Sequence, residues 1–263
     1  MTNPRSDRVR AVRGLARRSA RSGTGRFLVE GPQGVRELIR YAAPSIVDLY
    51  VTDAAGERYP EILETAGAAG VFVHPTGEDV LAAMADAQTP QGMIAVAQQP
   101  EAHLDDLLAG AGPRLLVLCH EIRDPGNLGT IIRAADASGA DAVLISGNSV
   151  DLFAPKVVRS TAGSIFHLPV VSGLEVEATV ARLAGHGIRT YATEGEAAHL
   201  LGQVDLMAPH CWVMGTEATG LPEAVAAQCT ERVAIPIYGK AESLNLAMAA
   251  TICLYSSATA ARA

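Results

Sequence analysis

Short apolar runs alternate with amphipathic stretches along the first part of the chain. The apolar runs predict strands at 27–30, 46–51, 71–73 and 93–97. The stretches between them predict helices at 32–41, 60–69 and 76–85. Alternation of this kind over residues 26–98 is typical of a small α/β domain.

The second part of the chain continues the alternation. Its apolar runs predict strands at 115–119, 142–146, 167–171, 188–192, 211–214 and 233–237. Its amphipathic stretches predict helices at 128–138, 154–162, 175–184, 222–228 and 243–261. The runs LLVL and AVLI have no alternating polar face, as expected of parallel strands that helices cover on both sides. We therefore predict a mostly parallel sheet in a larger α/β domain.

Two segments lie outside these domains. Residues 1–25 predict a basic arm whose helix, over 5–21, ends at the flexible sequence SGTG. Residues 99–113 combine proline and glycine with a short helical pattern, and we interpret them as a linker. The predicted domains are thus 26–98 and 114–263.

The charge is unevenly distributed. Residues 1–26 hold eight arginines and one acid, Asp7, whereas the chain as a whole carries a net charge of −7. A basic arm on an acidic body fits a polyanionic partner such as nucleic acid. A helix whose arginines are merely solvated explains the same pattern equally well. The arm has no aromatic residue before Phe27, so it offers no platform for base stacking.

Composition excludes several classes of protein. With 49% apolar residues the chain can bury a sizeable core, and it has neither an apolar run of membrane-spanning length nor the apolar region of a secretory signal. Its four cysteines are far apart and form no CxxC, so we expect a cytoplasmic protein with reduced thiols and no metal. The motifs GxGxxG, GxxxxGK[ST], GxSxG and HExxH are absent, so no motif supports a dinucleotide-binding, P-loop, serine-hydrolase or zinc-protease function.

Polar residues gather at three junctions that follow strands in the second part of the chain, within residues 119–133, 212–222 and 233–247. Ligands of open α/β sheets bind at such junctions, because loops and helix N-termini converge there. Each segment alone also fits an ordinary capped helix or turn.

Five residues at these junctions are candidates for chemistry. Asn127 is predicted to cap the helix that carries Arg133, and Glu217 is the one acid of its loop. Ser243 is predicted to cap the last helix, with Asn245 in the first turn.

The three segments also carry a family resemblance. DPGNLGTIIRAADASGADAVLI, VMGTEATGLP and IPIYGKAESLNLAMAA resemble the motifs of the SpoU/TrmH branch of the SPOUT methyltransferases. RFLVEGPQGVREL, within residues 26–97, resembles the L30e-like substrate-binding domain that precedes such catalytic domains. The resemblance implies an α/β fold in which a trefoil-knotted, parallel-sheet SPOUT domain follows the smaller L30e-like domain.

The resemblance further implies S-adenosylmethionine as cofactor, methylation of a ribose 2′-hydroxyl in RNA, a homodimer and no metal. The N-terminal domain favours 23S ribosomal RNA as substrate. A tRNA ribose methyltransferase and a non-catalytic RNA-binding relative are the alternatives.

By matching position, the resemblance assigns the catalytic site to Arg133, Asn127, Glu217, Ser243 and Asn245. It assigns cofactor binding to Thr193, Glu194, Gly195, Met214, Gly215, Gly220, Ile235, Ile237, Ser243 and Leu244. RNA binding is predicted for Arg8, Arg10, Arg17, Arg18, Arg26, Arg159 and Ser160. A guanidinium does not ordinarily accept a proton at neutral pH. Arg133 therefore either has an unusually depressed pKa or stabilises the developing alkoxide while water removes the proton.

Overall fold

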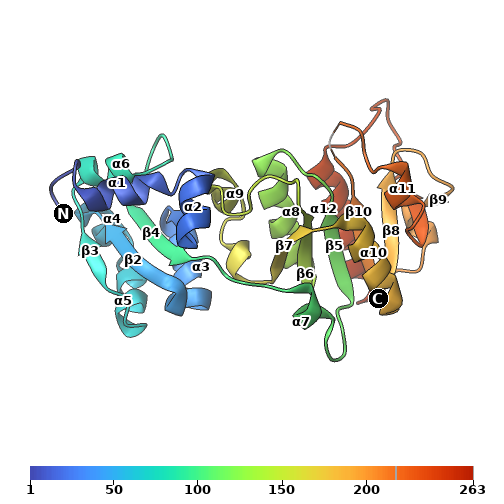
Figure 1. The fold of residues 1–263 in the computed structure, drawn as a ribbon, viewed down its shortest axis with the longest axis horizontal. Coiled ribbons are helices and arrows are strands. Elements are labelled where there is room, and N and C mark those ends of the chain that lie inside the picture. Colours follow the sequence, from blue (N-terminus) through green and yellow to red (C-terminus); the bar gives the residue numbers. More distant parts are fainter. Residues whose placement is uncertain (217, 263) are drawn as a thin grey trace. The chain divides into compact units, whose positions relative to one another are not determined.

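The computed structural model describes residues 1–216 and 218–262 (Figure 1). The chain forms two compact units, which are not contiguous in sequence. Unit 1 comprises Met1–Pro100 and Asp151–His167, and unit 2 comprises Glu101–Val150 and Leu168–Ala263. Residues 151–167, which the sequence placed within the domain 114–263, therefore pack with the N-terminal residues.

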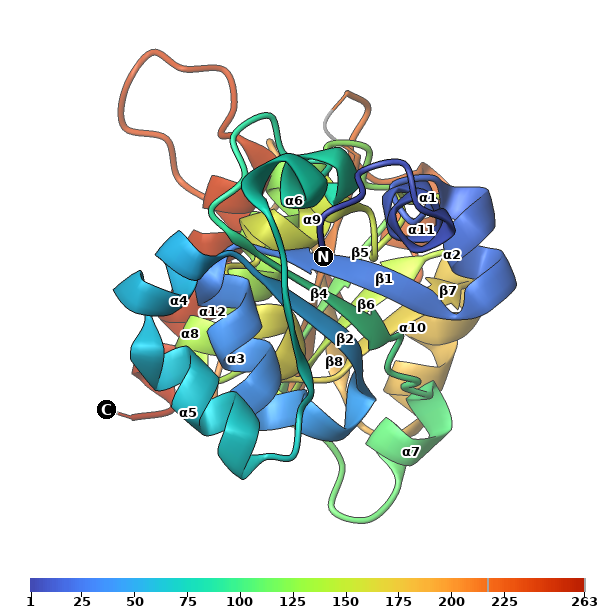
Figure 2. The same cartoon turned by 90° about the vertical axis from the view of Figure 1, so that its left-hand side faces the viewer.

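Unit 1 is built on a four-stranded sheet in the order β1-β4-β2-β3. Its strands are β1 (Arg26–Glu30), β2 (Ile46–Val51), β3 (Val73–Pro75) and β4 (Met93–Gln98). β4 is antiparallel to both neighbours, whereas β2 and β3 are parallel. The helices are α1 (Asp7–Gly14), α2 (Arg18–Thr24), α3 (Pro32–Ala42), α4 (Asp53–Arg58), α5 (Pro60–Ala68), α6 (Glu78–Met84) and α9 (Pro155–Ser160). α1 and α6 cover one face of the sheet, and α3 with α5 lies on the other (Figure 2).

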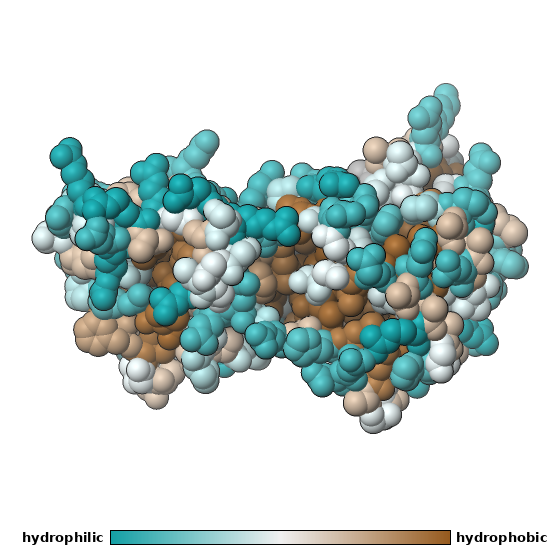
Figure 3. Space-filling view, viewed as in Figure 1, coloured by the Kyte–Doolittle hydropathy of each residue, from teal (hydrophilic) through white to brown (hydrophobic). Residues whose placement is uncertain are grey.

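The N-terminal arm is part of the unit 1 core. Val9, Val12 and Leu15 recur at helical spacing and are buried against Tyr50 and the apolar face of α6. The arm is also two helices where the sequence predicted one, because the chain breaks between α1 and α2 and α2 continues to Thr24. Gly25 ends α2 in the left-handed conformation, with φ of 64°. The surface over α1 and α2 is largely hydrophilic (Figure 3).

Unit 2 is built on a seven-stranded parallel sheet in the order β7-β6-β5-β10-β8-β11-β9. Its strands are β5 (Leu115–Cys119), β6 (Ala142–Ser146), β7 (Val170–Leu174), β8 (Arg189–Glu194), β9 (His199–Leu200), β10 (His210–Met214) and β11 (Glu231–Ala234). Its helices are α7 (Leu104–Leu108), α8 (Pro125–Ser138), α10 (Val176–Gly185), α11 (Glu223–Ala226) and α12 (Leu246–Ala260). α8 and α12 pack together on one face, and α7, α10 and α11 bury apolar residues against the other. The predicted parallel α/β sheet is confirmed.

Three boundaries differ from the sequence prediction, for local reasons. Asp124 caps α8, since its carboxylate accepts from the backbone N–H of Asn127. Asn245 caps α12, so the predicted cap at Ser243 is wrong and the helix begins at Leu246. The predicted linker contains α7, whose leucines belong to the unit 2 core. A trefoil-knotted path of the chain remains a prediction.

Among residues 1–216 and 218–262, no helix is both long enough and apolar enough to span a membrane. Across the same residues, no three His, Cys, Asp or Glu side chains are grouped so that they could hold a metal ion.

Candidate functional site

A cleft of about 620 Å³ opens at the carboxyl ends of β8, β10 and β11 and is closed by the first turn of α12. All three sequence junctions of interest follow strands of this sheet, and two of them line the cleft. Nine of the ten residues predicted to bind a cofactor line its wall: Thr193, Glu194, Gly195, Gly215, Gly220, Ile235, Ile237, Ser243 and Leu244. The tenth, Met214, is buried in β10, where its sulfur accepts a hydrogen bond from the Thr193 hydroxyl.

Gly215 allows the loop after β10 to fold back on itself. A Cβ at this position would lie 2.1 Å from the carbonyl carbon of Gly220 and 2.4 Å from the nitrogen of Leu221. Thr216 and Gly220 then exchange two backbone hydrogen bonds, at 3.0 and 3.1 Å. Gly220 has a φ of 69°, which favours glycine. The cleft wall is therefore bare backbone at a point where any side chain would clash.

The first and third junctions are joined by two asparagines. The Asn245 side-chain amide donates to Oδ1 of Asn127 across 3.0 Å. The side-chain oxygen Oδ1 of Asn245 meanwhile accepts from the backbone N–H groups of Ala247 and Met248. One side chain thus caps α12 and ties it to the first turn of α8.

Arg133 lies apart from the cleft wall. Its side chain projects from α8 into solvent and makes no hydrogen bond or ion pair with a described residue. Glu217, the remaining predicted catalytic residue, lies outside the described residues. The structure thus brings Asn127, Ser243 and Asn245 to the cleft or its edge, but does not bring Arg133 there.

The carboxylate of Glu194, in the cleft wall, forms an ion pair with Arg232 of the neighbouring strand β11. Nη1 of Arg232 lies 3.7 Å from Oε1 of Glu194, and the same guanidinium binds Glu223 through both Nη atoms. These hydrogen bonds from Arg232 lower the pKa of the Glu223 carboxyl. Arg232 was not predicted, since nothing in the sequence pairs β11 with the end of β8.

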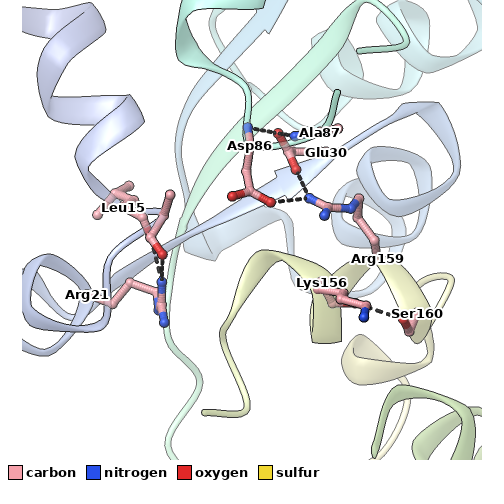
Figure 4. Close-up of polar contacts among 9 residues, drawn as sticks. Leu15, Arg21, Glu30, Asp86, Ala87, Lys156, Arg159 and Ser160 are labelled. Atoms are coloured by element: carbon pink, nitrogen blue, oxygen red, sulfur yellow. Dashed lines mark hydrogen bonds and ion pairs between the residues drawn. The ribbon is translucent and has the colours of Figure 1, made fainter. Parts of the chain in front are cut away.

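The residues predicted to bind RNA fall into two groups. Five arginines on the arm and β1 are exposed: Arg8, Arg10, Arg17, Arg18 and Arg26. Arg159 and Ser160 instead make contacts within unit 1 (Figure 4). Nη1 of Arg159 binds the carboxylates of Glu30 and Asp86, and the Ser160 hydroxyl donates to the Lys156 carbonyl.

Arg21 shows that not every arginine of the arm is available. Its side chain is only 3% exposed, pairs with Asp151 and donates to the carbonyls of Leu15 and Ala16. Arg13, which was not predicted, is exposed beside the other arginines of α1. The exposure of each side chain distinguishes Arg21 from Arg13, whereas the sequence alone does not.

The remaining wall of the cleft was not predicted. It is formed by Thr216, Thr219, Leu221, Glu242, Leu246 and Ala249. Five of the six lie within the second and third junctions, next to a predicted residue, so widening each predicted residue to its neighbours would have found them. Ala249 lies two residues beyond the third junction.

A parallel α/β sheet with a cleft at its carboxyl edge, in a chain that also contains a smaller α/β unit, is typical of two-unit α/β enzymes. The profile of the SpoU rRNA Methylase family matches residues 114–255. The profile of the MRM3-like substrate binding domain matches residues 6–95. The chain belongs to the SpoU rRNA methylase family.

Individual relatives resemble the chain over nearly its whole length. It is 34% identical to the 23S rRNA (guanosine(2553)-2′-O)-methyltransferase RlmP of Bacillus subtilis, over 95% of this chain and 96% of that protein. It is 33% identical to a 23S rRNA (uridine(2479)-2′-O)-methyltransferase of Streptomyces viridochromogenes, over 92% and 85%. The crystal structure of an AdoMet-bound rRNA methyltransferase from Sinorhizobium meliloti superimposes with a TM-score of 0.86 at 29% identity, covering 99% of this chain and 97% of that one.

Proposed function

We propose that this protein transfers a methyl group from S-adenosylmethionine to a ribose 2′-hydroxyl of 23S ribosomal RNA. The cleft at the ends of β8, β10 and β11 carries the proposal, because the residues that the family resemblance assigned to the cofactor converge there. The relatives named as 23S rRNA 2′-O-methyltransferases support the substrate. Since these act on guanosine and on uridine, we leave the target base open.

The residues of the cleft fit S-adenosylmethionine. Its volume of about 620 Å³ lies within the range of small-molecule sites. The bare backbone of Gly215 and Gly220 permits close approach, and Ile235 and Leu244 offer apolar surface to an adenine ring. Glu194, oriented by Arg232, can accept hydrogen bonds from ribose hydroxyls. When bound, the cofactor supplies an electrophilic sulfonium methyl group.

The chain's own residues position the attacking hydroxyl. We assign Asn127 and Asn245 to hold the loops at the cleft edge, and Ser243 to hydrogen-bond the ribose region. We assign Arg133 to stabilise the negative charge that develops on the ribose oxygen, because a guanidinium is a strong donor and a poor base. Water then accepts the proton.

A second copy of the chain completes this site. Met248, Ile252 and Tyr255 are 63%, 39% and 47% exposed, and their spacing of four and three residues puts them on one face of α12. We infer that this face packs against a second copy in a homodimer, as in the family that the sequence resembles. Arg133 lies outside the cleft of its own chain, and the homodimer offers a route by which it reaches the cleft of the partner.

The exposed arginines of α1 and α2 support RNA binding by unit 1. With Arg21 buried, at least six arginines of the first 26 residues still face solvent. We infer that they contact RNA phosphates, which position the substrate without reading its sequence. We place the reaction in the cytoplasm.

The test is a map of ribose methylation in RNA from a strain that lacks the gene. We expect one 2′-O-methyl group to be missing from 23S rRNA and to be restored by purified protein with S-adenosylmethionine. Restoration in tRNA alone would establish the tRNA alternative. Binding of RNA without any restored methyl group would establish the non-catalytic one.

Arg133→Ala separates the catalytic role from a structural one. We expect it to abolish transfer while S-adenosylmethionine affinity stays within about threefold, or ~0.6 kcal/mol. A large loss of cofactor affinity would contradict the role assigned to Arg133.

A further inference from the structure

Unit 1 contains a second cavity, of about 280 Å³, outside the methyl-transfer cleft. It lies between the β1–α3 turn, the loop before β4, and α9 with the turn that follows it. Val29, Met93, Ile94, Val158 and Phe166 supply apolar wall. Arg159 lines it as well, and so do Gln33 and Gln91. The cavity is near the lower end of small-molecule sites, so it suits one flat ring system.

Arg159 is fixed in this cavity by two carboxylates. Its Nη1 binds both Glu30 and Asp86, and the Glu30 carboxylate is itself held by the backbone N–H groups of Asp86 and Ala87 (Figure 4). The Glu30 side chain is only 5% exposed, so this anchor is rigid. The orientation of the guanidinium is therefore set before any ligand arrives.

The anchor leaves the binding edge of the guanidinium available. Both carboxylates use Nη1, and Nε and Nη2 of Arg159 have no hydrogen-bond partner among the described residues. In a guanidinium, Nε–H and one N–H of Nη2 point the same way and form a two-donor fork. Such a fork matches two adjacent acceptor atoms.

Local charge decides which acceptors fit. Two carboxylates face one guanidinium, so the cluster of Glu30, Asp86 and Arg159 carries a formal charge of −1. A phosphate would be repelled by this cluster, whereas a neutral base would not. Guanine presents two adjacent acceptors, O6 and N7, on its Hoogsteen edge, whereas adenine pairs an acceptor with a donor there. Cytosine has adjacent acceptors, O2 and N3, only on its Watson–Crick edge, and its single ring covers less of the apolar wall.

We propose that this cavity binds one guanine base of the substrate RNA, with the Nε and Nη2 fork of Arg159 on O6 and N7. The proposal rests on RNA being the substrate. The bound guanine is a recognition base outside the methyl-transfer cleft, and the apolar walls hold its ring. Arg159 thus reads a base and does not contact the phosphate backbone.

The test titrates the full-length protein with GMP, AMP, CMP, UMP and inorganic phosphate, followed by ligand-observed NMR. S-adenosylhomocysteine is present in excess to fill the cleft of unit 2. The four nucleotides share one phosphate, so any difference among them reports on the base. We expect GMP to bind at least about fivefold more tightly than the others. We also expect inorganic phosphate not to displace it.

Two variants and one control link that preference to the cavity. Arg159→Lys keeps a cation between Glu30 and Asp86 but removes the fork, and it should abolish the preference for GMP. Ala87→Leu should reduce GMP binding by filling the cavity, whose wall includes Ala87. Arg182→Lys changes an ion-paired arginine of unit 2 and should bind GMP like the wild type.

The proposal is overturned if the wild type shows no preference for GMP, or if Arg159→Lys retains it. Thermal unfolding of each variant shows whether it is folded. S-adenosylmethionine binding, measured separately by calorimetry, tests the cleft of unit 2. A failed guanine site with intact cofactor binding and methyl transfer would therefore leave the proposed function standing.

Discussion

Asn245 caps α12 and joins it to α8, and the two contributions can be measured apart. Asn245→Ala removes the acceptor for the backbone N–H groups of Ala247 and Met248, which costs about 1 kcal/mol in unfolding free energy. It also removes the 3.0 Å bond to Asn127, which is exposed to water and is therefore worth only about 0.5 kcal/mol. The expected loss is about 1.5 kcal/mol.

Asn245→Ser isolates the second contribution. Serine caps a helix about as well as asparagine but is too short to reach Asn127, so we expect a loss of only about 0.5 kcal/mol. Asn127→Ala removes the same bond from the other side. In a double-mutant cycle, Asn127→Ala/Asn245→Ala should therefore lose about 0.5 kcal/mol less than the sum of the two single losses.

Urea unfolding followed by tryptophan fluorescence gives these values for unit 2. Trp212 is the single tryptophan of the chain and is buried in β10, so its signal reports the unit that contains both asparagines. The reasoning is refuted if Asn245→Ser is as unstable as Asn245→Ala. It is also refuted if the two alanine substitutions add in full.

Four further outcomes follow from the structure. Gly215→Ala should abolish S-adenosylmethionine binding in calorimetry, because its Cβ would lie 2.1 Å from a backbone carbon; binding within tenfold of wild type would contradict this. Burial lowers the pKa of His210, so the neutral form is favoured in the folded state, and stability should be full above pH ~6.5 and decrease as the pH falls below that value. His210→Asn should flatten this dependence in thermal unfolding at pH 5.5 and 7.5. Arg21→Ala should destabilise unit 1 by about 3 kcal/mol, since it leaves buried partners unsatisfied. Arg18→Ala should leave stability within about 0.5 kcal/mol yet weaken RNA binding and its salt dependence.

The strands of the second part of the chain could be predicted because burial on both faces leaves continuous apolar runs. β5, β6 and β10 lie within one residue of their predicted bounds. β11 ends three residues early, at Ala234, because Ile235 and Ile237 face the cleft and not the sheet. An apolar residue that lines a ligand site has the same sequence signal as one that extends a strand.

The helix ends were less predictable, because several cap residues compete at each junction. DPGN contains both an aspartate and an asparagine that can cap, and the proline decides between them, since it suits the first helical position after Asp124. At the last helix, Ser243 and Asn245 compete in the same way. The side chain that also reaches Asn127 is the one that caps, and that long-range contact has no local signal.

Membership of 151–167 in unit 1 could not be read from the sequence either. The segment lies between two strands of the parallel sheet, and its helical pattern is ordinary. What binds it to unit 1 are side chains more than a hundred residues away: Arg21 on Asp151, Glu30 on Arg159, Glu37 on His167, and Phe27 against Phe153. Because these residue types are common on protein surfaces, nothing in the sequence marks them as partners.

The arginines of unit 1 show why composition alone could not assign an RNA surface. The sequence gives each of them the same charge, but the structure divides them by the carboxylates they meet. Arg21 is buried against Asp151 and is structural, whereas the other arginines of α1 and α2 are exposed, and among them Arg10 pairs with Asp7. Arg159 is intermediate, since the carboxylates of Glu30 and Asp86 together outweigh its charge while leaving two of its nitrogens able to donate. An arginine in that state no longer attracts a phosphate strongly, but it can still distinguish one base from another. The two proposals, phosphate binding and base recognition, therefore fall on different arginines of unit 1.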